Sequence, residues 1–158
     1  MNTARSGWLP LPLHKLPNGL MNVLALNTYD FEAFAAHYLE VIGFTSISLL
    51  GRSGHQGVDL AAVDSKGQST VVQCKRHLHH MVSSEPVQRL HSFALARGAT
   101  RKLLVTTSDF TRQCEEEAAV TGTELINGKK LESQIAQHMP NYFAKASQPQ
   151  ANTTSRNH

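Results

Sequence analysis

The sequence predicts an α/β fold in which a mixed central sheet is flanked by helices. Segments with apolar residues at helical spacing alternate with short apolar runs rich in β-branched residues. The expected order is helix, three strands, helix, strand, helix, strand, helix, and strands joined through helices pair in parallel. The chain has 158 residues, 41% hydrophobic and 17% charged, which is enough apolar material for one packed domain.

The first half of the chain is expected to contain one helix and three strands. Helical spacing predicts a first helix from Phe31 to Ile42, capped by Asp30 and ended by Gly43. The three strands that follow, the last two forming a hairpin, are expected at residues 44–50, 58–63 and 69–75. A glycine-rich loop, GRSGHQG, joins the first two strands.

Helices and strands alternate in the second half. Helices are predicted at residues 86–97, 110–121 and 128–138, and strands at residues 102–107 and 124–126. Thr106, Thr107 and Ser108 end a buried strand just before a helix, so we expect them, with Asp109, to form an ordinary helix-capping region.

The ends of the chain differ from this domain in composition. Residues 1–27 lack clear periodicity and are expected to form an arm or linker, residues 28–146 the domain, and residues 147–158 a polar, disordered tail. Neither a signal peptide nor an apolar run long enough for a membrane is evident, and Cys74 and Cys114 form no paired motif, so we expect a cytoplasmic protein with reduced thiols.

Charge favours a polyanionic partner only weakly. The formal net charge is +3 and the pI is about 9.0, with nine histidines that add charge below neutral pH. Nucleic acid is therefore one option among several, and the site residues must decide.

The informative cluster is an acid on one strand of the hairpin and Gln-x-Lys on the next. Gln73 and Lys75 are two residues apart, so they share a face of their strand, while Cys74 points the other way. The hairpin can bring the Asp59 carboxylate alongside them. Exposed strand residues or a turn-capping acid would give the same pattern, so spacing alone is a weak indication of catalysis.

Phosphodiester hydrolysis needs groups of this kind. Asp59 can offer a carboxylate oxygen to a hard divalent cation, Gln73 an amide oxygen and Cys74 its backbone carbonyl. Such a cation polarises a phosphate and lowers the pKa of bound water. Lys75 can orient that water and stabilise developing negative charge.

Longer strings of the sequence make the prediction more specific. FEAFAAHYLEVIGF, GRSGHQGVDLAAV, VVQCKR, LLVTTSDFT and GTELINGKKL occur in this order over about residues 30 to 132. Together they resemble the catalytic domain of Mrr-like restriction endonucleases, which belong to the PD-(D/E)xK nuclease superfamily. The resemblance implies a restriction-endonuclease-like three-layer α/β sandwich, with a mixed central sheet flanked by helices.

The same resemblance implies roles for particular residues. Asp59 would bind the metal, Gln73 would stand where many relatives carry Glu, and Lys75 would be the catalytic lysine. Glu32 matches the acid in the first helix that often completes the metal site of the family. His55 departs from the family pattern, because relatives usually carry Asp at this loop position.

The resemblance also implies an activity and its partners. We expect a Mg²⁺-dependent endodeoxyribonuclease, with Mn²⁺ as a substitute, that cleaves double-stranded DNA in type IV-like restriction of foreign or modified DNA. A homodimer follows by analogy, and the short segment before Asp30 favours a separate recognition subunit. The alternative is a catalytically inactive DNA-binding or interaction subunit of the same fold. DNA sequence and methylation preference are not predicted.

Basic side chains near the site have several interpretations. Arg52, Arg76 and His77 flank the site and are the candidate DNA contacts, although an exposed polar loop explains His77 equally well. A zinc site built from Cys74 and the histidines of HLHH is an alternative that lacks a second ligand pair at typical spacing. Arg97, Arg101 and Lys102 are expected to be solvated surface residues.

Overall fold

The computed structural model describes residues 23–51 and 57–142 of the chain. In chain order its elements are α2 (Thr28–Val41), β1 (Thr45–Leu49), β2 (Leu60–Val63), β3 (Ser69–Lys75), α3 (Glu85–Arg97), β4 (Arg101–Thr106), α4 (Arg112–Thr121), β5 (Glu124–Ile126) and α5 (Gly128–His138). None of the helices in these ranges is long and apolar enough to cross a membrane.

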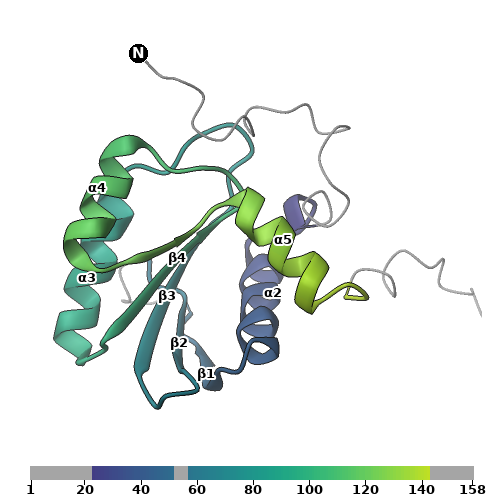
Figure 1. Cartoon of the computed structure of the whole chain (residues 1–158), viewed down its shortest axis with the longest axis horizontal. Coiled ribbons are helices and arrows are strands. Elements are labelled where there is room, and N and C mark those ends of the chain that lie inside the picture. The colour runs from purple at the N-terminus through teal and green to yellow at the C-terminus, as the bar shows by residue number, and fades with distance from the viewer. Residues whose placement is uncertain (1–22, 52–56, 143–158) are drawn as a thin grey trace, which may run out of the picture.

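The strands form one five-stranded mixed sheet in the order β1-β2-β3-β4-β5. The β1–β2 and β2–β3 pairs are antiparallel, whereas β3–β4 and β4–β5 are parallel. Helices α3 and α4 cover one face of the sheet, and α2 and α5 lie on the other (Figure 1). The predicted three-layer α/β architecture is therefore confirmed.

Each face of the sheet has its own core, because the strands alternate apolar side chains between two helical layers. Leu60, Val72 and Val105 pack toward α2 and α5, with Phe31 and Phe34 among the largest side chains of that cluster. The cluster on the α3 and α4 face contains Val58, Val71, Val87, Leu90 and Leu104. Cys74 contacts the first cluster and Cys114 lies in the second, and both cysteines are free thiols.

Two of the expected helix caps are wrong. Asn27, not Asp30, caps α2, because its side-chain oxygen accepts a hydrogen bond from the Asp30 backbone N–H at 2.8 Å. Helix α4 starts at Arg112 and is capped by Thr111, whose hydroxyl accepts from Cys114 N–H at 3.1 Å. In both cases the helix begins where a short polar side chain can turn back onto its first free N–H groups.

The first predicted strand is shorter and more exposed than its alternating pattern suggested. β1 lies at the edge of the sheet, and a register shift between Thr45 and Ser48 interrupts its pairing with β2. Ser46 has a positive φ of 50°, which is uncommon for a residue with a side chain. A bulge of this kind is frequent on edge strands, where it twists the strand and limits further pairing.

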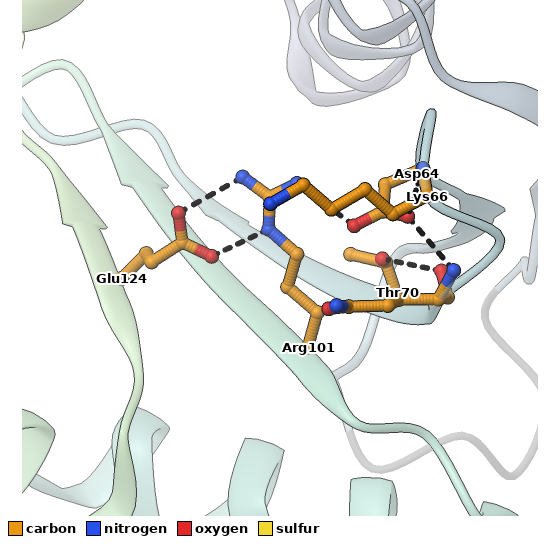
Figure 2. A network of polar contacts seen from close by, with 6 residues as sticks. Asp64, Lys66, Thr70, Arg101 and Glu124 are labelled. Carbon is orange, nitrogen blue, oxygen red and sulfur yellow. Dashed lines mark hydrogen bonds and ion pairs between the residues drawn. The ribbon is translucent and has the colours of Figure 1, made fainter.

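An ion-pair network fastens the end of the sheet where β4 begins (Figure 2). The Arg101 guanidinium makes two hydrogen bonds to Glu124, of 2.7 and 2.9 Å, and one of 3.2 Å to Asp64. Asp64, only 6% exposed, also accepts from the backbone N–H groups of Lys66 and Gln68, and the Gln68 N–H is the main cause of its lowered pKa. The network joins β5, β4 and the β2–β3 turn, so the expectation that Arg101 is simply solvated was wrong.

We predict that Arg101→Met lowers the thermal midpoint by about 5 °C, because it leaves the buried Asp64 carboxylate with one partner fewer. The matched control is Arg112→Met, which breaks the exposed pair with Glu116 and should change the midpoint little. Thermal unfolding followed by circular dichroism gives both values. Equal effects of the two substitutions would contradict the structural role of the network.

Candidate functional site

Strand β3 has an open edge over its last three residues. β2 begins at Leu60, which pairs with Val72, whereas β3 continues to Lys75. On its other side β3 remains paired with β4 as far as Lys75 and Thr106. The N–H and C=O groups along this open edge therefore need partners other than a strand.

Asp59 supplies that partner. The backbone N–H of Asp59 donates to the Val72 carbonyl at 3.0 Å, which holds Asp59 directly before the first residue of β2. Its carboxylate then accepts the Cys74 backbone N–H through Oδ2 at 2.7 Å. A side-chain carboxylate thus takes the place of a strand carbonyl and is fixed at the opening of the sheet.

A second carboxyl group reaches Asp59 from helix α2. The pKa of Asp59 is raised to about 7, mainly by burial and in addition by the nearby charge and hydrogen bond of Glu32. The Cys74 N–H and the positive charge of Lys75 act in the opposite direction but do not offset these effects. Two adjacent, partly buried carboxyl groups that resist joint ionisation form a site that a cation would stabilise.

Gln73 lies on β3, next to Cys74, and is fully buried. Neither its Oε1 nor its Nε2 has a hydrogen-bond partner among the described residues. A Cβ at Gly57, whose φ is +83°, would lie 3.4 Å from Gln73 Nε2, so this glycine allows the backbone to approach the amide. An unpaired amide oxygen in this position is a donor of the type that hard cations prefer.

The cluster packing places Gln73 on the sheet face opposite Cys74. The Cys74 thiol points toward the α2 side, and burial raises its pKa well above the ordinary value, with Asp59 and Glu32 adding to the effect. In residues 23–51 and 57–142, no three or more His, Cys, Asp or Glu side chains are grouped as a metal site. The alternative of a zinc site from Cys74 and the histidines therefore has no geometric support there.

Lys75 is half-buried at the end of β3. Its positive charge lowers the pKa values of both Asp59 and His77. The Lys75 ammonium group is therefore close enough to interact with the carboxylate at the open edge of β3 and with the segment that follows the strand. Its carbonyl accepts a hydrogen bond from the Thr106 hydroxyl at 2.6 Å. The lysine is therefore held at the same end of the sheet as the carboxyl pair.

Hydroxyl groups that the sequence analysis assigned to helix capping have another role. Thr106, Thr107 and Ser108 hydrogen-bond to the backbone of Lys75, His77 and His80, respectively, and so fasten the segment that follows β3. These contacts are possible because β3 and β4 pair in parallel, so the carboxyl ends of both strands lie at the same end of the sheet. A run of three hydroxyl residues at the end of a buried strand was the available signal.

The candidate DNA-contacting residues divide into three cases. Arg76 turns back toward the start of the domain, where Nη1 donates to the Leu24 carbonyl at 3.2 Å. His77 is half-buried, and burial is the main cause of its lowered pKa. Arg52 and His55 lie outside the described residues.

Lys102 was expected at the surface but is buried, with 7% exposure. Its ammonium group donates to the Thr121 carbonyl and contacts His91 Nδ1 at 2.9 Å. Burial lowers the pKa of Lys102. This lysine fastens the end of α4 against α3, at the opposite end of β4 from the site.

A restriction endonuclease family model, Mrr_cat, matches residues 23–135. The chain therefore belongs to this restriction endonuclease family. Several solved structures share its fold, as expected from the resemblance to the Mrr-like catalytic domain. No curated protein matches the sequence of the chain.

Three solved structures illustrate the shared fold. The restriction endonuclease MspJI, in complex with a 27-mer oligonucleotide, is 24% identical, with a TM-score of 0.60, and the match covers 81% of this chain and 33% of that one. The protein of unknown function AF1548 is 19% identical, with a TM-score of 0.60 and coverage of 70% and 66%. A repair endonuclease from Pyrococcus abyssi is 19% identical, with a TM-score of 0.54 and coverage of 65% and 46%. The match thus spans one third to two thirds of the length of each of these structures.

We predict that the metal-free protein loses stability as the pH rises through neutrality. Folded Asp59, with its pKa near 7, keeps a proton that the unfolded chain, with a value near 3.8, has already released. This contribution is complete below about pH 4 and is lost as the pH passes 7. From pH 5 to pH 8 we expect a loss on the order of 2 kcal/mol, measured by urea unfolding in EDTA.

Asp59→Asn is the test variant for this prediction, because it keeps an acceptor for the Cys74 N–H and removes the titration. It should flatten the pH dependence, while Glu40→Gln, at an exposed acid of the same helix as Glu32, should leave it intact. An unchanged slope in Asp59→Asn would show that another group is responsible.

We also predict that Gln73→Met stabilises the metal-free protein by about 1 kcal/mol, because it replaces an unpaired buried amide with an apolar side chain of similar length. Urea unfolding in EDTA measures the change, with exposed Gln88→Met as the control. A clear loss of stability in Gln73→Met alone would mean that the amide has a structural partner in solution.

Proposed function

We propose that this domain is a Mg²⁺-dependent endodeoxyribonuclease, with Mn²⁺ as a substitute metal, that hydrolyses phosphodiester bonds of double-stranded DNA. The observation that carries the proposal is the Asp59 carboxylate, held at the open edge of β3 by the Cys74 N–H and placed against the carboxyl group of Glu32. Membership of the restriction endonuclease family supports the same activity.

The groups at this edge are oxygen donors suited to a hard cation. Asp59 and Glu32 would hold the metal through carboxylate oxygens, Gln73 through its unpaired amide oxygen and Cys74 through its backbone carbonyl. The fit rests on the two adjacent carboxyl groups and on the buried amide, which has no hydrogen-bond partner in the described part of the chain. When bound, Mg²⁺ supplies charge neutralisation for a phosphate and a more acidic water.

The protein groups have separate tasks in the proposed reaction. The Cys74 N–H fixes the direction of the Asp59 carboxylate, and the Glu32 carboxyl group lies beside it. Lys75 brings a positive charge to the same opening, where it orients the attacking water and stabilises negative charge on the phosphate. The hydroxyl of Thr106 keeps the Lys75 backbone in place.

A biological role in restriction of foreign or modified DNA is part of this proposal, and it is supported by the family. MspJI, one of the similar structures, is described as a restriction endonuclease in complex with an oligonucleotide. We further propose a cytoplasmic homodimer, which would supply one active site for each DNA strand, and a separate subunit for sequence recognition.

One observation favours a second candidate function, a DNA-binding subunit that no longer cleaves. Gln73 carries an amide where many relatives carry a carboxylate, which leaves the site with one negative charge fewer to hold a cation. The two candidates differ in one measurement. The nuclease nicks or linearises plasmid DNA with Mg²⁺ or Mn²⁺ and not with EDTA, whereas the binding subunit leaves plasmid intact under all three conditions.

We predict that Lys75→Ala lowers metal-dependent cleavage by at least about a hundredfold, because the charge beside the attacking water and the phosphate is lost. The measurement is the initial rate of plasmid nicking, on methylated and unmethylated DNA. Lys66→Ala is the matched control, since Lys66 is an exposed lysine in the turn before the same strand. Asp59→Ala should abolish cleavage as well.

Cleavage by Lys75→Ala at the rate of the Lys66→Ala protein would overturn the catalytic assignment. Circular dichroism and the unfolding midpoint of each variant show whether a lost rate reflects lost chemistry or lost fold. The half-buried position of Lys75 leads us to expect only a small change in stability.

A further inference from the structure

The segment from Arg76 to Val82, which we call the β3–α3 loop, follows directly after Lys75. In Figure 1 it lies at the same end of the sheet as the start of α4 and beyond the carboxyl end of β4. The proposed catalytic chemistry uses Lys75 but no side chain of this loop beyond it. The loop nevertheless has a defined backbone structure, no acidic residue and exposed apolar side chains.

The backbone of the loop is fixed at close intervals. The Thr107 hydroxyl accepts from the His77 N–H at 3.0 Å and lies 2.9 Å from the His77 carbonyl. The Ser108 hydroxyl donates to the His80 carbonyl at 2.6 Å, and the Val82 N–H donates to the Asp109 carbonyl at 2.8 Å. The anchoring residues, from Thr106 to Phe110, are all buried. The loop is therefore preorganised in one conformation without a bound partner.

The outward side chains are apolar side chains and imidazoles. Leu78 and Met81 are 40% and 42% exposed, and both His79 and His80 are exposed. The sequence from residue 65 to residue 84 contains no Asp or Glu. Arg76 is directed away, toward Leu24, so the projecting part of the loop begins after it.

We propose that the β3–α3 loop is a rigid DNA-contacting element that packs into a groove beside the phosphate to be cleaved, with Leu78 and Met81 against sugars and base edges. This inference rests on the proposed DNA substrate. Its position next to Lys75 and the absence of acidic residues over residues 65–84 favour a polyanion over an apolar protein surface. Apolar side chains that project from a preorganised element are a known means of contacting a DNA groove.

Contacts by Leu78 and Met81 can be distinguished experimentally from general electrostatic attraction to DNA. Phosphate contacts release counterions and make binding depend on salt, whereas apolar contacts do not. Loss of Leu78 and Met81 should therefore weaken DNA binding at every salt concentration without altering the slope of affinity against salt. Loss of a phosphate contact would change the slope.

The test measures binding of the full chain to a fluorescent, mixed-sequence DNA duplex in EDTA, over a series of salt concentrations. We expect Leu78→Ala/Met81→Ala to bind about five- to tenfold more weakly than the wild type, with an unchanged salt slope. The matched control is Leu95→Ala/Val120→Ala, which removes two exposed apolar side chains at the far ends of α3 and α4. The control should bind as the wild type does.

Equal DNA binding by the loop variant and the control would overturn the proposal. A loop variant that binds DNA normally but changes the oligomeric state on gel filtration would also overturn it, in favour of contact with a second copy. If the wild type binds DNA through the loop but never cleaves plasmid, the nuclease proposal fails and the loop proposal stands. If the wild type binds no DNA, both fail.

Discussion

The site depends on the hydrogen bond between the Cys74 backbone N–H and the Asp59 carboxylate. A strand that runs on past its neighbour exposes N–H groups that must find an acceptor. Here the acceptor is an acidic side chain, so satisfying the backbone also brings a carboxylate to the point where β2 begins. Burial of this carboxylate is the main cause of the raised pKa of Asp59, about 7. The hydrogen bond that satisfies the strand edge therefore also positions the carboxylate that we propose as a metal ligand.

The two ends of the sheet treat polar groups in opposite ways. Where β4 begins, the Arg101 guanidinium is shared between Asp64 and Glu124, so these three charges are paired (Figure 2). Where β3 ends, the carboxyl groups of Asp59 and Glu32 are neighbours, and the amide of Gln73 has no hydrogen-bond partner among the described residues. Unpaired groups of this kind reduce stability and persist where they serve a ligand. The end of the sheet with the unpaired groups is the end at which we propose the active site.

Parallel pairing of β3 and β4 explains why Lys75 and the β3–α3 loop belong to one structure. Both strands end at the same edge, so the hydroxyl groups that follow β4 can hold the backbone that follows β3. The Thr106 hydroxyl thus holds the Lys75 backbone, and the Thr107 and Ser108 hydroxyls hold the loop. Backbone hydrogen bonds between Val82 and the segment from Asp109 to Thr111 complete the order at this end of the sheet.

The sequence by itself determined the fold class, the order of the elements and the family, because hydrophobic periodicity and local motifs are properties of short segments. β3, β5 and α5 have the bounds expected from their patterns. The alternation of Gln73, Cys74 and Lys75 was also predictable, since it follows from strand geometry.

The contact between the carboxyl groups of Glu32 and Asp59 could be known only from the tertiary structure, since it joins helix α2 to the residue before β2. The tertiary structure also decided that Thr106 to Ser108 hold a loop instead of capping a helix, that Arg76 binds Leu24 and that Lys102 is buried. These outcomes depend on distances between distant segments, and a local pattern contains no information about them.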